Sequence, residues 1–454
     1  MRLIVSLLLL LSLGRVGSSE AQSGVTRQLA AYMQGQQAVN QFAGVVLVTR
    51  HDSVLLHQAY GLADAEWQVP NTPDTRFALA SITKQFTAIA VLQLAERGQL
   101  RLTDKLSQYV PGVPNGNGIT LHQLLTHTAG LALDFEELYL VHTDATTDSA
   151  LAFIRRQPVQ FAPGARIGYS NVGYFLLGLV IEKASGLRYG TYLQRYILNV
   201  AGLHQSGLMS NTALVSGLAR LYYREGAVLV KNPYINWELN VGHDGLYATA
   251  GDLLRFSQAL RSATLLSPAS LALMNTPHNQ AYGGTGFLDR YGYGVFIDPY
   301  YSHRHHLLTH SGGYFGAMTT LDRYPQDEVV VIVLSNNQAE SHIISYGLAG
   351  ILFGKPVEVP YEHRALPAAP PVPPAYAGQY GPHHILYVKG HLYLQNLETP
   401  LVAETPTRFF SQQNPDRTVE FLPAKSGKVT ALVLTKGGVR ETFPKSGKPK
   451  APAR

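Results

Sequence analysis

A serine and a lysine three positions apart are the residues whose types and spacing most clearly suggest chemistry. Ser81-Ile82-Thr83-Lys84 opens an apolar segment that predicts a helix from Ser81 to Gly98. Residues i and i+3 share a helix face, so the hydroxyl and the amine can meet. A lysine whose pKa is held down by an apolar pocket can accept the serine proton. The pair predicts an activated serine nucleophile, although an ordinary helix start with a solvated lysine has the same spacing.

A second group, Tyr169-Ser170-Asn171, precedes an apolar helix predicted from Val172 to Ala184, which Asn171 can cap. A tyrosine can pass a proton between nucleophile and leaving group, and an asparagine amide can hold an acyl carbonyl. The same pattern recurs in Tyr234-Ile235-Asn236, but that copy lies in an irregular segment. Tyr169 is therefore the preferred tyrosine.

A third group, His310-Ser311-Gly312-Gly313, lies at the end of a strand predicted from His306 to His310. Glycines let the backbone approach a substrate closely, and the N–H groups of Gly313 and Ser81 could form an oxyanion hole. Three segments of similar pattern are not preferred: His243-Asp244-Gly245 and the Lys-Ser-Gly sequences at Lys425 and Lys445. The Lys425 copy lies in a turn of the C-terminal β segment and the Lys445 copy in the tail, and neither precedes a comparable pair of strands.

The elements that must position these groups form a mixed pattern. Helical patterns lie between strands near the start of the chain and strands that follow the third group. This order predicts an α+β fold in which an antiparallel sheet joins both ends of the domain and is flanked by helices, with a helical subdomain. The predicted strands cover Gly44–Thr49, Ser53–Tyr60, His306–His310, Ala317–Leu321 and Val329–Leu334.

A proline-rich run from Ala365 to Pro374 divides the chain. Before it we predict the main domain over residues 22–358, and around it a linker over 359–374. After it, short alternating strands separated by glycines predict a small antiparallel β-barrel over 375–445. The Lys-rich end, 446–454, is predicted to be a basic disordered tail.

The first 21 residues are typical of a secretory signal peptide, with Arg2, a short apolar run and small residues before a cleavage site after Ala21. Because no later segment is apolar enough to span a bilayer, we predict an exported, periplasmic or extracellular protein. The absence of cysteine excludes disulfides, thiolate catalysis and zinc–thiolate sites.

The formal net charge of +6 is concentrated in the Lys-rich tail, so it does not indicate a nucleic-acid-binding face. Four histidines close together, His303, His305, His306 and His310, raise the alternative of a metal site. They do not share one face of a strand, and no carboxylate is spaced among them. The sequence predicts no metal and no cofactor, and it leaves the oligomeric state open.

The order of the three groups resembles the serine β-lactamase-related superfamily, which includes class C β-lactamases, D-Ala-D-Ala carboxypeptidases, D-amino-acid peptidases and esterases. Further stretches resemble it over residues 30–352: Phe77–Ala80, Leu124–Leu131, Gly245–Leu253 and Val333–Asn336. The resemblance implies that Ser81, Lys84 and Tyr169 are catalytic. It also implies that Asn171, His310, Gly312 and Gly313 bind the substrate, and it implies a small appended β domain.

One difference from class C enzymes affects which class of substrate is expected. They usually carry lysine in the third group, where this chain has His310, which is mostly neutral near pH 7. An esterase or peptidase, including one for D-amino-acid peptides, is therefore expected to be favoured over a β-lactamase. A penicillin-binding carboxypeptidase and a non-catalytic sensor on the same fold remain alternatives. His127 is interpreted as structural.

Overall fold

The computed structural model describes residues 23–447 apart from 52, 143, 226–227, 280–289, 299–300, 368–369, 396–398, 414–415 and 426. The chain forms two compact units: one spans Phe42–Ser345, and the other joins the chain up to Gln41 to that from Tyr346 onward. The predicted signal peptide and most of the predicted tail lie outside the described residues. The boundaries at 358 and 374 divide the chain differently from these units and stay a prediction.

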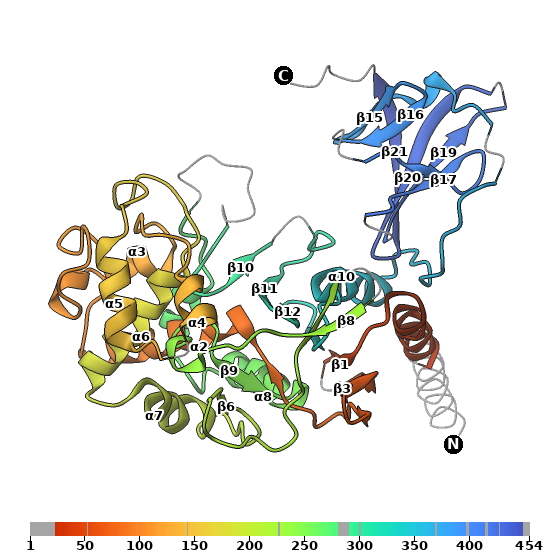
Figure 1. Cartoon of the computed structure of the whole chain (residues 1–454). Helices are drawn as coiled ribbons and strands as arrows, with labels where there is room; N and C mark the ends of the chain where they lie inside the picture. Colours follow the sequence, from red (N-terminus) through yellow and green to blue (C-terminus); the bar gives the residue numbers. More distant parts are fainter. Residues whose placement is uncertain are drawn as a thin grey trace, which may run out of the picture. The chain divides into compact units, whose positions relative to one another are not determined.

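The larger unit contains a six-stranded antiparallel sheet in the order β10-β11-β12-β13-β1-β2 (Figure 1). Because β1 is paired on both sides, its Val45–Val48 segment is buried and apolar throughout. Strands from both ends of the unit thus meet in one sheet, which confirms the predicted α+β fold class. The strands are β1 (Gly44–Arg50), β2 (Ser53–Tyr60), β10 (Phe296–Ile297), β11 (Leu308–Tyr314), β12 (Ala317–Tyr324) and β13 (Val329–Ser335).

Most of the α-helices lie between β2 and β10 along the chain, and α10 follows β13. Helix α8 packs on β13 and β1, whereas α2 packs against α6 in a cluster of helices that forms the rest of the unit (Figure 1). The helices are α2 (Thr83–Glu96), α3 (Leu121–Leu125), α4 (Glu136–Val141), α5 (Thr147–Arg156), α6 (Asn171–Ser185), α7 (Tyr189–Leu193), α8 (Ala250–Arg261), α9 (Pro268–Met274) and α10 (Ser341–Leu352).

Short strands complete this unit. A three-stranded sheet has the order β5-β9-β6, and two hairpin-like pairs, β3-β4 and β7-β8, lie elsewhere in it. Their bounds are β3 (Leu62–Asp64), β4 (Val69–Pro70), β5 (Phe77–Ala78), β6 (Gly207–Leu208), β7 (Tyr222–Glu225), β8 (Val228–Lys231) and β9 (Leu246–Ala248).

Two local predictions need correction. The side chain that caps α6 is that of Ser170, which accepts the N–H of Gly173, and Asn171 is already the first helical residue. The strand that was expected to end at His310 instead begins at Leu308 and runs on through the glycines. Gly312 is therefore flanked by the strand β12, with its Cα opposite Thr319.

The smaller unit contains an eight-stranded antiparallel sheet in the order β16-β15-β14-β21-β20-β19-β18-β17. This curled sheet agrees with the predicted C-terminal β fold. Its strand β21 includes Ser446 and Gly447, which were expected in the disordered tail. The strands are β14 (Gly378–Tyr380), β15 (His383–Val388), β16 (His391–Leu394), β17 (Val402–Ala403), β18 (Arg408–Phe410), β19 (Arg417–Pro423), β20 (Val429–Lys436) and β21 (Val439–Gly447).

A helix over residues 23–40, which the sequence reading did not predict, belongs to the same unit. The hydroxyl of its buried Tyr32 donates a hydrogen bond of 3.0 Å to the carbonyl of Gly437, in the turn between β20 and β21. Within the described ranges, no helix combines the length and apolar character that crossing a membrane requires.

Candidate active site

The turn that carries Ser81 is fixed by short strands on either side of it. Ser81 lies in a 3₁₀ turn, Ala80–Ile82, that leads directly into α2. Strand β5, just before this turn, pairs with β9, and the N–H of Leu79 donates to the carbonyl of Leu246 over 2.8 Å. In return, the N–H of Leu246 donates to Thr83 Oγ1 over 3.1 Å. The segment that precedes β9 is thereby held against Ser81.

The residue immediately before Ser81 has an unusual backbone. Ala80 has a φ of 47°, a left-handed conformation that costs a non-glycine residue free energy unless its surroundings impose it. The neighbouring strand β11 supplies part of these surroundings, because a Cβ on Gly312 would lie 2.2 Å from Leu79 O and 3.0 Å from Ala80 Cβ. The glycine therefore lets β11 run in direct contact with the turn that presents Ser81.

Ser81 and Lys84 meet as the spacing predicted. Lys84 Nζ donates a hydrogen bond of 2.8 Å to Ser81 Oγ and a second, of 3.2 Å, to the carbonyl of His243. Ser81 Oγ in turn donates over 2.8 Å to Asp244 Oδ1, which lies 3.4 Å from Lys84 Nζ. The serine hydroxyl thus lies between an ammonium donor and a carboxylate acceptor, all buried.

Asp244 is the residue of this site that the sequence reading missed. It belongs to the His243-Asp244-Gly245 segment that was rejected as a copy of the third group. One general signal was present, because a lysine buried on an apolar helix needs a counter-ion, but this signal does not identify which carboxylate supplies it. Gly245 also fits this position, since a Cβ there would lie 2.6 Å from the carbonyl of Asn240.

The ion pair reverses the expected protonation of Lys84. Burial lowers the pKa of Lys84, but the charge of Asp244 and the contacts with Tyr169 outweigh it, so that the pKa is raised. Burial raises the pKa of Asp244, yet Lys84 and His243 more than offset this, and the pKa is lowered. The resting site consequently holds an ammonium and a carboxylate, and Lys84 has no free electron pair with which to accept the serine proton.

Tyr169 lies over this ion pair. Lys84 Nζ is 5.1 Å from the centroid of the Tyr169 ring and 5.7 Å from that of Tyr174, within the range of cation–π attraction. Burial raises the pKa of Tyr169, although Lys84 and a hydrogen bond with Ser81 oppose the shift. The phenol therefore stays protonated and can act as a proton donor.

Asn171 and His127 brace the same region. Asn171 Nδ2 donates over 2.6 Å to Asp134 Oδ2, while the N–H of Ser170 donates over 3.1 Å to His127 Nδ1. The centroid of the His127 ring lies 4.2 Å from that of Tyr169, with the two rings tilted by 31°, and burial lowers the pKa of this histidine. These contacts fit the interpretation of His127 as a structural residue, which stays a prediction.

His310 is buried behind the site with both ring nitrogens bonded. Its Nδ1 donates over 2.7 Å to the carbonyl of Ser311, so its Nε2 accepts from the hydroxyl of Tyr291 over 3.1 Å. Burial and the charge of Lys84 lower the pKa of His310 to about 3. Gly313, by contrast, is exposed on β11. The third group therefore presents an exposed glycine and a neutral imidazole.

Two other histidines of the group considered as a metal site, His305 and His306, bond to separate carboxylates. His305 Nδ1 bonds to Asp327 over 2.9 Å and His306 Nδ1 to Asp298 over 2.9 Å. In the part of the chain that the structure describes, no group of three or more histidines and carboxylates is placed to hold a metal ion.

Comparison with known proteins identifies relatives over the larger part of the chain. Residues 29–351 match the family described as Beta-lactamase. Penicillin-binding protein 4* of Bacillus subtilis is 29% identical over 71% of this chain and 74% of its own length. Esterase EstB of Burkholderia gladioli is 29% identical over 56% of this chain and 74% of its own length.

Solved structures of similar proteins match the same part of the chain. A penicillin-binding protein from Bacillus halodurans superposes with a TM-score of 0.62 at 28% identity, covering 71% of this chain and 98% of that one. The D-amino acid amidase of Ochrobactrum anthropi, at 20% identity and a TM-score of 0.61, shares the fold over 74% of this chain and 99% of its own.

Proposed function

This chain belongs to the beta-lactamase family, a family of serine hydrolases, and we propose that it cleaves an ester or peptide substrate through an acyl-enzyme on Ser81. Peptides that contain D-amino acids are included in this class. The observation that carries the proposal is the buried cluster in which the Ser81 hydroxyl donates to Asp244 and accepts from Lys84.

The geometry supports a separate catalytic role for each residue of the cluster. As Ser81 Oγ bonds to the substrate carbonyl carbon, its proton passes to Asp244 Oδ1, the atom to which it is already hydrogen-bonded. The ammonium of Lys84 stabilises the negative charge that develops near Oγ. When the scissile bond breaks, the leaving group takes the phenol proton of Tyr169. The proton held by Asp244 is then transferred to Tyr169, so that the phenol is protonated again. Water then hydrolyses the acyl ester by the reverse sequence.

The state of His310 supports an ester or uncharged peptide over a β-lactam. A β-lactam carries a carboxylate, which binds best to a cation. The neutral His310 already uses its one N–H on the carbonyl of Ser311. The esterase among the relatives is consistent with this choice. The penicillin-binding relative favours the second candidate, a D,D-carboxypeptidase or β-lactamase.

Two further features remain part of the proposal. We propose that the protein is exported, because its N-terminal sequence is typical of a signal peptide. We also propose that residues 375–445 supply no catalytic group. A chain truncated near Pro367 should still be labelled by an acylating probe if it folds.

A substrate panel separates these activities. Purified protein is assayed with p-nitrophenyl acetate and butyrate, D-aminoacyl anilides, D-Ala-D-Ala peptides and a chromogenic cephalosporin. A fluorophosphonate label mapped to the Ser81 peptide, with turnover of an ester or anilide, supports the proposal. A folded protein that neither reacts with the label nor turns over any substrate would instead indicate a non-catalytic sensor.

A further inference from the structure

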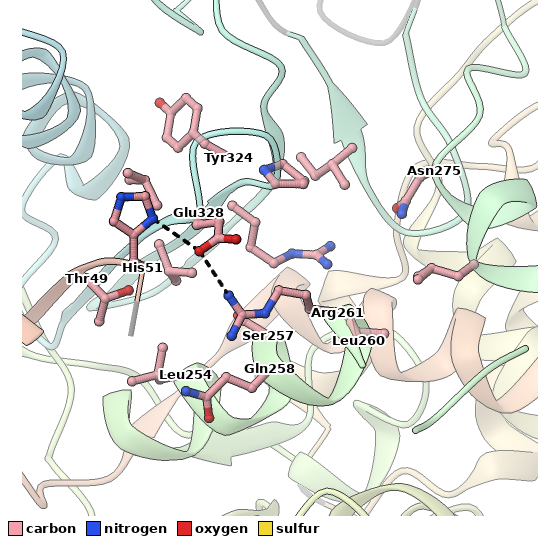
Figure 2. Close-up of a pocket in the computed structure, with 16 residues that line it drawn as sticks. Thr49, His51, Leu254, Ser257, Gln258, Leu260, Arg261, Asn275, Tyr324 and Glu328 are labelled. Atoms are coloured by element: carbon pink, nitrogen blue, oxygen red, sulfur yellow. Dashed lines mark hydrogen bonds and ion pairs between the residues drawn. The ribbon is translucent and has the colours of Figure 1, made fainter. Parts of the chain in front are cut away.

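A cavity lies between helix α8 and one end of the six-stranded sheet, and Ser81 does not line it. It encloses about 250 Å³, a little below the size of typical drug-sized ligand sites. Figure 2 shows its labelled residues converging from α8, from the end of β1 and the turn after it, from the end of β12 and the β12–β13 turn, and from Asn275 at the end of α9. Aliphatic side chains form much of its wall: Leu254, Leu260, Leu271, Leu308, Val329 and Val330.

One charged side chain that lines this cavity is almost completely buried. Arg323, on β12, is 6% exposed. Its Nη2 donates over 3.0 Å to Gln85 Oε1, and its Nε has no hydrogen-bond partner. Burial lowers the pKa of Arg323 to about 10, so the guanidinium is still charged at neutral pH. Taking such a charge out of water is costly unless an anion or strong acceptors surround it.

No carboxylate of the described residues forms an ion pair with Arg323. Glu328 also lines the cavity, but it lies at the exposed rim, with its Oε2 3.1 Å from His51 Nδ1 and 3.9 Å from Arg261 Nη1 (Figure 2). The neighbouring Asp322 accepts hydrogen bonds from Thr309 and Ser345 instead. Among the residues that the structure describes, the buried guanidinium therefore has no counter-ion.

We propose that this cavity binds a small organic monocarboxylate, with its carboxylate against Arg323 and its apolar body among the aliphatic side chains. A guanidinium matches the planar geometry of a carboxylate and forms charge-assisted hydrogen bonds with it. An inorganic anion would meet the charge but leave the aliphatic wall uncovered. An uncharged apolar molecule would cover the wall but leave Arg323 unpaired. The monocarboxylate satisfies both requirements.

Binding is tested by calorimetry on the full chain with phenylacetate and hexanoate, and with their uncharged amides as matched ligands. We expect saturable binding of one carboxylate per chain and at least tenfold weaker binding of the amides. Arg323→Met should weaken carboxylate binding at least tenfold. The control Arg261→Met removes an exposed rim charge and should change it less than about threefold. Leu254→Trp retains Arg323 but fills the cavity, so it should also abolish binding.

Each other outcome would overturn the proposal. Equal affinity for acid and amide would mean that Arg323 does not recognise the ligand. Inorganic phosphate binding as tightly as phenylacetate would show an anion site without an apolar subsite. Binding that survives both Arg323→Met and Leu254→Trp, in proteins that unfold cooperatively, would place the ligand elsewhere. The absence of binding to the folded wild type would show that the cavity serves no carboxylate.

Discussion

Ser81 Oγ donates a hydrogen bond of 2.8 Å to Asp244 Oδ1, across 163 positions of sequence. This contact gives the nucleophile a carboxylate acceptor, while Lys84 on the adjacent helix turn remains an ammonium. The site therefore differs from one in which a neutral lysine alone activates the serine. Its reactivity should depend on Asp244 as well as on the Ser-x-x-Lys pair.

Replacing the nucleophile should abolish the chemistry without unfolding the protein. We expect Ser81→Ala to eliminate ester hydrolysis and fluorophosphonate labelling, because it removes the Oγ atom that we propose forms the acyl bond. Its free energy of unfolding should change by about 1 kcal/mol, the usual effect of losing a hydrogen bond. Ser262→Ala, at an exposed serine, is the matched control. Label retained by the Ser81→Ala protein would refute the assignment.

Removing the charge of Asp244 should slow acylation and change its pH dependence. Asp244→Asn keeps the shape but loses the proton acceptor, so we expect kcat/KM for p-nitrophenyl butyrate to fall about 100-fold or more. Without its counter-ion, buried Lys84 should have a lowered pKa. Residual activity should then rise with pH as the neutral amine forms.

The measurement for this variant is the pH–rate profile from pH 5 to 10 beside that of the wild type. Asp298→Asn, which removes a carboxylate from a surface ion pair, controls for general charge effects. Activity of Asp244→Asn within about threefold of the wild type would show that Asp244 is only a counter-ion and not the acceptor of the serine proton.

The neutral charge of His310 should make the protein prefer esters to β-lactams. We expect the wild type to hydrolyse a short-chain p-nitrophenyl ester better than a chromogenic cephalosporin. Because the pKa of His310 is lowered to about 3, acidification from pH 7.5 to 5.5 should not improve cephalosporin turnover. His310→Lys should raise the cephalosporin-to-ester ratio of kcat/KM about tenfold, and the neutral His310→Gln should not. Efficient cephalosporin hydrolysis by the wild type, unimproved by lysine, would contradict this reasoning.

The buried Asp322 should make the larger unit less stable as pH rises. Burial raises its pKa from 3.8 to about 6, although Ser345 and Thr309 donate to it. Because the folded state binds this proton more tightly, its contribution is complete below pH 3.8 and is lost as pH rises through about 6. Two pKa units correspond to about 3 kcal/mol.

The difference in unfolding free energy between the wild type and Asp322→Asn isolates this effect. Measured by urea denaturation from pH 4 to 7.5, the difference should move in favour of the variant as pH rises. A difference that stays constant across this range would show that Asp322 has an ordinary pKa.

Local patterns sufficed for much of the fold. The strand Ser53–Tyr60 was predicted at its observed bounds, because its composition and the turn before it can be recognised from neighbouring residues. The meeting of Ser81 and Lys84 was equally local, because one helix turn joins them. The cap of α6 was misplaced by one residue, since Ser170 and Asn171 are both good caps.

The features of the site that could not be predicted from the sequence depend on contacts between distant segments. Asp244 lies next to Ser81 because β9 pairs with β5, and the sequence around position 244 does not predict that pairing. Likewise, the engagement of both nitrogens of His310 depends on Tyr291, which no spacing rule connects with the third group. Pairings of this kind are set by the tertiary fold, so single-sequence patterns cannot rank His243-Asp244-Gly245 above its rivals.

The pairing of β1 with β13 also has a consequence for how the protein is made. Gly44 pairs with Ser335, so the first strand of the larger unit has no partner on that side until almost the whole unit has been synthesised. The entropic cost of closing so long a loop grows only slowly with length, but formation of such non-local contacts is slow. During that interval the β1–β2 hairpin exposes an apolar edge that can pair with other chains. Efficient production should therefore depend on chaperones that protect this edge during synthesis, and a chain that ends before residue 335 should aggregate.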